Sequence, residues 1–186
     1  MSNFSVEHLA IPGVVMIKPR KFADSRGWFM ETWKAPDFSA LGVTADFVQD
    51  NHSLSKQRGT IRGLHFQTPP HEQAKLVRVV SGAVYDVAVD LRRGSATYGK
   101  HCGATLTASG GEQLFVPRGF AHGFCTLEDN TEVVYKVDGL YSPQCDAGLF
   151  WGDPNLAIEW PLPRDSVLVS DKDAKLPGFA SFLSPF

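Results

Sequence analysis

The sequence predicts a single all-β domain in which short antiparallel strands form a sandwich or a jelly roll. Its 17 glycines and 12 prolines are spread along all 186 residues instead of gathering in a linker, which indicates many short elements joined by turns. Runs rich in Val, Ile, Phe and Tyr recur between these turns, as is typical of strands. Many short strands at such spacing favour a β-sandwich or a jelly roll. The length suits one domain, residues 1–186, with a sizeable core.

Eight strands are expected in chain order, at residues 14–17, 28–33, 61–67, 76–80, 84–91, 113–116, 123–127 and 132–137. Each is rich in β-branched or aromatic residues, and turn formers such as Ser81-Gly82 separate them. Only residues 36–41 and the segment after Asp171 have a helical pattern, and both are short. The helices should therefore be peripheral.

Period-two alternation is clearest in VYDVAVDL, residues 84–91. Successive strand side chains point to opposite faces, so two sets of side chains are expected to separate. The first set is Val84, Asp86, Ala88 and Asp90, and the second is Tyr85, Val87, Val89 and Leu91.

Charge and cysteine content limit the function classes. The 18 basic and 20 acidic side chains nearly cancel, so no global field favours nucleic acid or an anionic membrane surface. Cys102, Cys125 and Cys145 form no CxxC pair, and their odd number argues against a disulfide framework. The first residues lack a signal-like basic and apolar pattern, and no run approaches ~20 apolar residues. We expect a soluble, cytoplasmic protein.

Two motifs favour the jelly roll over the sandwich. Residues 111–122, GEQLFVPRGFAH, place Gly111, Pro117, Gly119 and His122 at the spacing of the second motif of the cupin superfamily, which they resemble. The resemblance implies a cupin-type jelly roll with this histidine facing the interior.

The first cupin motif is present in altered form. Gly59 and His65 match it, but Gln67 stands where a metal-binding cupin carries its second histidine, and Glu72 lies near the place of its glutamate. A neutral amide is a poor ligand for a divalent metal, whereas imidazole and carboxylate are good ones. We therefore expect no metal and no other cofactor, and a metal site of His65, Glu72 and His122 is the alternative.

A polar cavity is expected around His65. Residues i and i+2 share a strand face, so His65 and Gln67 point into one cavity, while Leu64 and Phe66 pack into the opposite layer. An imidazole with a pKa near the unperturbed value of about 6.5 suits a general base at neutral pH. The alternative is a structural histidine. It is disfavoured because polar side chains are dense on the neighbouring strand positions, Arg62, Lys75 and Arg78 among them.

Longer motifs make the resemblance specific. These are DSRGWFME (24–31), QDNHS (49–53), RGLHFQ (62–67), KLVR (75–78), VAVDLR (87–92) and PRGFAHGF (117–124). Over nearly the whole chain the sequence is similar to the dTDP-4-dehydrorhamnose 3,5-epimerase family. The resemblance implies a homodimer that converts dTDP-4-dehydro-6-deoxy-D-glucose into dTDP-4-dehydro-L-rhamnose, a step towards L-rhamnose for surface polysaccharides.

The resemblance also implies catalytic roles. His65 matches the family's base, and Tyr135 in VVYKV matches its acid on the opposite face of the sugar ring. Lys75 would stabilise the oxyanion at C4, and Asp173 in SDKD would hold the second nitrogen of His65, with Asp171 the next candidate. Asp86 either partners Lys75 or is a surface residue of an alternating strand.

Further positions match family residues that contact substrate. They are Arg26, Glu31, Gln49, Asn51, Arg62, Gln67, His122, Asp146 and Lys172. For Arg26 and Glu31 an exposed strand pair is the competing interpretation. Phe22, Trp28 and Phe29 either stack on the base or belong to the core.

One departure affects the predicted reaction. Leu140 stands where some relatives carry a second tyrosine beside the one that matches Tyr141, so a contact that steers the ring is missing. A single-centre epimerase of a related dTDP-4-keto sugar is therefore an alternative. A metal-dependent cupin, a non-catalytic binding module and a ketoisomerase on the same fold are less favoured.

Overall fold

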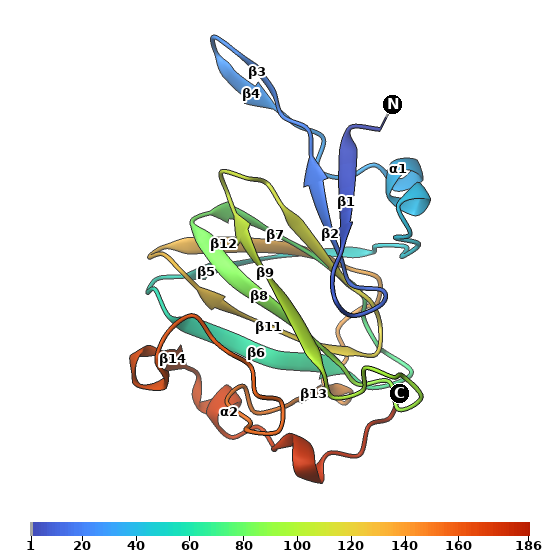
Figure 1. Cartoon of the computed structure of the whole chain (residues 1–186), viewed down its shortest axis with the longest axis vertical. Coiled ribbons are helices and arrows are strands. Elements are labelled where there is room, and N and C mark those ends of the chain that lie inside the picture. Colours follow the sequence, from blue (N-terminus) through green and yellow to red (C-terminus); the bar gives the residue numbers. More distant parts are fainter. Residues whose placement is uncertain (1) are drawn as a thin grey trace.

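The computed structural model describes residues 2–186, and two sheets packed face to face form its body (Figure 1). The first sheet has the order β1-β2-β10-β7-β12-β5 and the second the order β13-β6-β11-β8-β9, with β14 added beside β6. All pairs are antiparallel except β14 with β6. The predicted all-β architecture is therefore present.

The strands of the first sheet are β1 (Phe4–His8), β2 (Val15–Pro19), β10 (Gln113–Val116), β7 (Lys75–Ser81), β12 (Thr131–Val137) and β5 (Gln49–Ser55). Those of the second are β13 (Asp146–Gly148), β6 (Thr60–Gln67), β11 (Phe120–Thr126), β8 (Ala83–Asp90), β9 (His101–Thr107) and β14 (Leu168–Val169). The α-helices are α1 (Ala35–Ala40) and α2 (Asp171–Ala174). Within residues 2–186 no helix is long and apolar enough to cross a bilayer.

The alternation of residues 84–91 is confirmed. Val84 and Ala88 pack in the cluster between the two sheets, with Val77 and Leu114 of the first sheet. Tyr85, Val87, Val89 and Leu91 instead face the outer side of the second sheet, where Leu149, Leu156 and the C-terminal aromatics cover them. As expected, Leu64 and Phe66 pack in this outer cluster. Both faces of β8 are thus buried, which explains its nearly continuous apolar sequence.

The N-terminal part departs from the expected strand at 28–33. Only Gly27–Phe29 is a strand, β4, and it pairs with β3 (Phe22–Asp24) in a separate hairpin that projects from the body (Figure 1). Phe22, Trp28 and Phe29 are exposed, Phe29 by 66 %. Their assignment to the core was therefore wrong for this chain.

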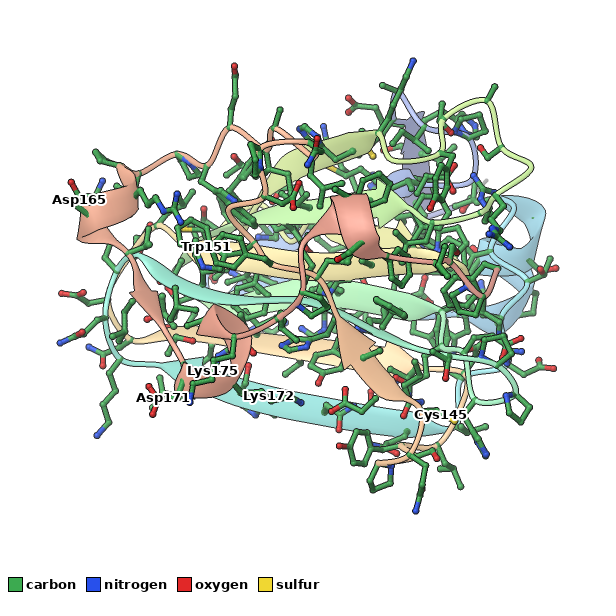
Figure 2. All side chains as sticks on the ribbon, turned by 90° about the horizontal axis from the view of Figure 1, so that it is seen from below. Cys145, Trp151, Asp165, Asp171, Lys172 and Lys175 are labelled. Carbon is green, nitrogen blue, oxygen red and sulfur yellow. The ribbon has the colours of Figure 1, made fainter. Side chains whose placement is uncertain are left out.

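The C-terminal segment runs along the outer side of β6, below it in the view of Figure 1 and nearest the viewer in Figure 2. There β14 pairs with the start of β6 through Leu168 and Val169. The helix α2 follows at once, and the Ser170 side chain caps it by accepting from the backbone N–H of Asp173. Lys172 and Asp173 are placed beside β6 in this way.

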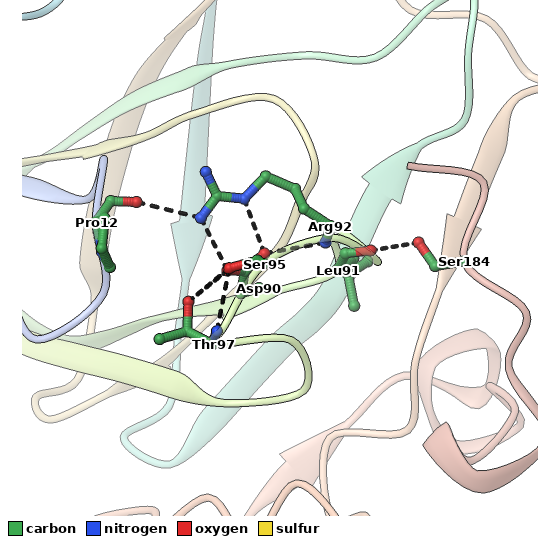
Figure 3. Close-up of polar contacts among 7 residues, drawn as sticks. All are labelled: Pro12, Asp90, Leu91, Arg92, Ser95, Thr97 and Ser184. Atoms are coloured by element: carbon green, nitrogen blue, oxygen red, sulfur yellow. Dashed lines mark hydrogen bonds and ion pairs between the residues drawn. The ribbon is translucent and has the colours of Figure 1, made fainter.

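A buried carboxylate fastens the end of β8 (Figure 3). Asp90 accepts from the backbone and the guanidinium of Arg92, and from the hydroxyls of Ser95 and Thr97, both at 2.6 Å. Burial opposes the charge, but these donors outweigh it and hold the pKa of Asp90 well below its ordinary value. Arg92 also donates to the carbonyl of Pro12, so this hydrogen-bond network links the β1–β2 turn to the body of the fold.

Candidate active site

A cavity of about 800 Å³ opens between the two sheets and brings most of the predicted site residues together. Strands β5, β6, β7, β11 and β12 line it, and β13 and α2 complete its rim. Eleven predicted residues lie on its wall: Gln49, Asn51, Arg62, His65, Gln67, Lys75, His122, Tyr135, Asp146, Lys172 and Asp173. Arg26 and Glu31 do not line it.

His65 of β6 is held by a carboxylate from the C-terminal segment. Its Nε2 lies 3.1 Å from Oδ1 of Asp173, and the other oxygen of Asp173 accepts from the backbone N–H of Gly63. Burial lowers the pKa of His65, Lys75 and Lys172 lower it further, and Asp173 opposes the shift. The imidazole is therefore neutral at physiological pH. With its Nε2 proton directed to Asp173, its lone pair is on Nδ1. Asp171, the other candidate, is exposed.

Tyr135 lies on the opposite wall. It belongs to β12 of the first sheet, with Asn51 of β5 as its cross-strand neighbour, whereas His65 belongs to the second sheet. Burial raises the pKa of Tyr135, and the charge of Arg62 opposes the shift. The phenol thus keeps its proton at neutral pH and can donate it. An acid and a base therefore line the same cavity from different sheets.

Lys75 is the partly buried cation of the cavity. It begins β7, and its Nζ lies 3.5 Å from the carbonyl oxygen of His65. Burial lowers the pKa of Lys75 to about 8, with Asp86 and Asp146 opposing the shift. The amine is therefore mostly charged at pH 7 and is poorly neutralised by neighbours, which suits stabilisation of an oxyanion.

Asp86 differs from both expected interpretations. It is fully buried, so the surface interpretation is wrong, and its Oδ1 lies 2.5 Å from Nε2 of His122. Its other oxygen has no hydrogen-bond partner among residues 2–186. The contact partner of Asp86 is therefore His122, while Lys75 feels its charge at longer range. His122 is also the cross-strand neighbour of His65.

The rim carries a second cationic group. Lys172 of α2 (Figure 2) lies 2.5 Å from Oδ2 of Asp146, which raises the pKa of Lys172. The Tyr141 hydroxyl donates to the same oxygen at 3.2 Å. Arg62 donates to Ser55 and to the carbonyl of Leu54. These contacts use two of the five N–H bonds of its guanidinium, and three remain for a ligand.

The two amide residues of β5 are preorganised. Gln49 and Asn51 share a face of the strand, and the Gln49 side chain donates to the Asn51 side chain at 2.8 Å. Gln67 is different, because its amide is engaged by backbone groups. It donates to the carbonyls of His71 and Leu140 and accepts from the N–H of Ser142. Gln67 therefore faces the cavity as predicted, but with little capacity left for substrate.

The β3–β4 hairpin keeps Arg26 and Glu31 away from the cavity of their own chain. The Arg26 side chain is 88 % exposed and pairs with Asp24, and Glu31 accepts from Asn3. The expected contact of both residues with substrate is not made within one chain. The sequence left open an exposed pair of Arg26 with Glu31. In the structure Arg26 instead pairs with Asp24.

The three residues of the alternative metal site do not converge on a common point. His65 is directed to Asp173 and His122 to Asp86, while Glu72 does not line the cavity. Across residues 2–186 no group of three or more His, Cys, Asp or Glu side chains is placed to hold a metal ion.

Tyr141 lines the cavity, although it was not among the predicted site residues. It lines the wall and contacts Asp146, but it was noted only as the neighbour of Leu140. The signal for it was its place in the loop between β12 and β13, since loops that follow strands often carry site residues. Gln73 also lines the cavity and was not expected there.

The fold, with an imidazole and a phenol on facing sheets, defines a jelly-roll isomerase of the cupin type. The family model described as dTDP-4-dehydrorhamnose 3,5-epimerase matches residues 8–181, and the chain belongs to this family. A dTDP-4-dehydrorhamnose 3,5-epimerase from Shigella flexneri is 49 % identical over 164 residues, which cover 88 % of this chain and 89 % of the relative.

Solved structures agree. The dTDP-4-dehydrorhamnose 3,5-epimerase of Bacillus anthracis, with TDP and PPi bound, has a TM-score of 0.91 at 48 % identity and covers 94 % of this chain and 99 % of its own. The dTDP-6-deoxy-D-glucose-3,5-epimerase of Legionella pneumophila, in complex with dTDP-4-keto-L-rhamnose, has a TM-score of 0.89 at 40 % identity, covering 94 % and 92 %. The expected family and jelly roll are confirmed.

Proposed function

We propose that this enzyme inverts C3 and C5 of dTDP-4-dehydro-6-deoxy-D-glucose and so forms dTDP-4-dehydro-L-rhamnose. One observation supports the chemistry most strongly. A neutral imidazole on one sheet and a protonated phenol on the other line a single cavity. Inversion beside a ketone needs a base on one face of the ring and an acid on the other, and this arrangement provides both.

His65 is proposed as the base. It removes the proton from the carbon beside the C4 ketone through Nδ1, because Nε2 is directed to Asp173. The carboxylate fixes the tautomer and stabilises the imidazolium that forms. Burial lowers the pKa of His65, so the base form is present throughout the neutral range.

Lys75 and Tyr135 are proposed to complete the reaction. Loss of the C–H proton leaves an enolate, whose charge develops on the C4 oxygen, and the Lys75 ammonium is the partly buried cation available to it. Tyr135 then returns a proton to the opposite face. Its raised pKa keeps that proton in place until the enolate needs it.

The polar rim is proposed to hold the nucleotide diphosphate. Arg62 has three free N–H bonds, and Lys172 adds a second cation on the wall of the same cavity. Gln49, Asn51 and His122 offer amide and imidazole groups to the sugar and the base, and Asp146 orients Lys172. No nucleic-acid or membrane partner is proposed.

We propose a homodimer in which the β3–β4 hairpin of one chain completes the site of the other. The hairpin exposes Trp28 and Phe29, which is costly in water, and Arg26 at its turn does not line the cavity of its own chain. In a dimer these groups would cover a neighbour. Light scattering tests the dimer, and Arg26→Ala should raise KM without changing the thermal midpoint.

A reducing compartment such as the cytoplasm is proposed on the basis of the thiols. Cys102 and Cys125 are buried, Cys145 is partly buried, and all three are free. Burial raises the pKa values of Cys102 and Cys125 to about 11, so neither is reactive at neutral pH.

The decisive experiment is incubation with dTDP-4-dehydro-6-deoxy-D-glucose in deuterated water, with the label scored at C3 and C5. We expect label at both carbons. His65→Ala should lose exchange and inversion, whereas Tyr135→Phe should keep exchange and lose inversion. The matched control is His52→Ala, which changes an exposed histidine paired with Glu132.

Other results of these experiments would change the proposed mechanism. Exchange at the wild-type rate in His65→Ala would reassign the base, and label at one carbon alone would favour the single-centre reaction. That alternative is retained because Leu140 is exposed and carries no hydroxyl at the position where some relatives have one. Turnover that a chelator abolishes and zinc or iron restores would instead support a metal-dependent enzyme.

A further inference from the structure

The crossover between the two sheets is fastened by side-chain amides. Residues 138–145 leave β12 of the first sheet and enter β13 of the second, and they carry Tyr141 onto the cavity wall. Such a connection has no strand partner of its own, so other groups must satisfy its backbone. Gln67 and Gln73, whose side chains both line the cavity, supply several of these bonds.

The two glutamine side chains contact backbone groups close together in this segment. Gln73 Nε2 donates to the carbonyl of Gly139 at 2.6 Å, and Gln67 Nε2 donates to the carbonyl of Leu140 at 3.2 Å. The N–H of Ser142 donates to Gln67 Oε1 at 2.6 Å. The Gln67 amide also donates to His71 at 2.7 Å, and its side chain is almost completely buried, with the residue 4 % exposed. The residues on both sides of Tyr141 are therefore held.

The clamped segment acts on the rim through one oxygen. Tyr141 donates to Asp146 Oδ2, the same atom that Lys172 contacts. Asp146 itself lies opposite Gln67 in the β13–β6 ladder. A carboxylate oxygen that already accepts a hydrogen bond from a phenol interacts less strongly with an ammonium, because the two donors share its charge. Tyr141 in its clamped position thus leaves more of the Lys172 charge to a bound anion.

We propose that Gln67 and Gln73 form an amide clamp that positions Tyr141 on Asp146 and thereby makes Lys172 available to the nucleotide diphosphate. This rests on the proposed function for the identity of the ligand. Gln67 is a positioning residue in this account. At the place where a metal-binding cupin has its second histidine ligand, this chain has a residue that organises the mouth of the cavity.

The test compares three substitutions of one kind. Gln67→Met keeps the length of the side chain and removes its three clamp contacts, and Gln73→Met removes one. Gln144→Met changes an exposed glutamine of the same segment and is the matched control. We expect Gln67→Met to raise KM about tenfold, which corresponds to about 1.4 kcal/mol, with kcat changed less than threefold. Gln73→Met should have a smaller effect, and the control none.

Two readouts separate positioning from a general structural effect. In a Tyr141→Phe background Gln67→Met should add little, because both changes break one chain of contacts. Gln67→Glu should have a KM defect that grows as the pH rises. The ionised carboxylate faces two carbonyls, whereas the protonated one still donates to one of them and accepts from Ser142. Relative to the wild type, the defect of Gln67→Met should not depend on pH.

The outcomes are distinct. KM within twofold of the wild type for Gln67→Met, or effects that add fully to those of Tyr141→Phe, would overturn the clamp. If the wild type turned over no substrate, the proposed function would fail, and the affinity for dTDP measured by calorimetry would still decide the clamp by the same comparison. Should Gln67→Met not fold, Gln73→Met and its coupling to Tyr141→Phe carry the test.

Discussion

Replacing Asp173 by asparagine removes the charge behind the proposed base and leaves its volume unchanged. Asp173 Oδ1 lies 3.1 Å from His65 Nε2, and Oδ2 accepts from Gly63. An asparagine can keep the second contact, but its NH₂ group then faces Nε2, which favours the tautomer with the proton on Nδ1. That is the nitrogen proposed to accept the substrate proton, so the lone pair would point the wrong way.

The magnitude follows from two effects. A hydrogen bond to a charged group contributes about 1.5–3 kcal/mol, which corresponds to about 10- to 150-fold in rate. The unfavourable tautomer adds to this, and we expect kcat to fall about 10²- to 10⁴-fold in total. Asp171→Asn changes an exposed aspartate two residues earlier on α2; it is the control and should have near wild-type activity.

The pH profile provides an independent check. The base form of His65 exists above its pKa, which burial lowers and Asp173 partly restores. Without Asp173 the pKa should fall further, so the acid limb of kcat/KM moves to lower pH while the plateau drops. The assay is deuterium incorporation at C3 and C5 followed by NMR between about pH 5 and 9. Activity within threefold of the wild type, or an acid limb that moves to higher pH, would refute the reasoning.

Three further predictions concern single side chains. Lys75→Met should slow deuterium exchange about 10²- to 10³-fold with little change in dTDP affinity, because it removes the cation at the developing oxyanion; equal losses in both would contradict this role. Tyr135→Phe should still exchange but form no inverted product, and product at more than a tenth of the wild-type rate would exclude Tyr135 as the acid. Asp90→Asn should lower the free energy of unfolding by roughly 2–4 kcal/mol, or about 4–16 °C in Tm, since five donations converge on this buried carboxylate. Its depressed pKa stabilises the fold above the unfolded value of about 3.9, so the difference from the wild type should shrink as the pH falls below about 4, and a constant difference would argue against the charge.

Much of the fold was predictable because its strands bury apolar residues. The runs at 61–67, 84–91, 113–116 and 132–137 all became strands with nearly the expected bounds. β5 and β9 were missed for a physical reason. QDNHSLS and HCGATLT are polar or interrupted by glycine, and β5 presents its polar side chains to the cavity. A strand that lines a polar site lacks the apolar pattern by which strands are recognised.

The site was predictable where a motif fixes a strand face. His65 and Gln67 face the cavity because they are two residues apart on β6, and Asp173 reaches His65 from a segment that only the family resemblance could assign. Asp86 could not be placed, since alternation gives the face of a residue but not whether that face is covered. Gln67 shows a similar limit. The motif located the side chain, but two of its three partners lie in the crossover, more than 70 residues away in the chain.

Lys172 and Asp173 are consecutive residues on a helix of one turn, and the pair β14–β6 that anchors it has two residues per strand. In the proposed mechanism, binding of the nucleotide by Lys172 and orientation of the imidazole by Asp173 therefore depend on the same short helix. We expect an anion bound by Lys172 to hold this short turn, and with it the contact between Asp173 and His65, in place. A sugar without its diphosphate should therefore lose turnover as well as affinity. Proton abstraction by His65 should then be most efficient with ligands that carry a diphosphate.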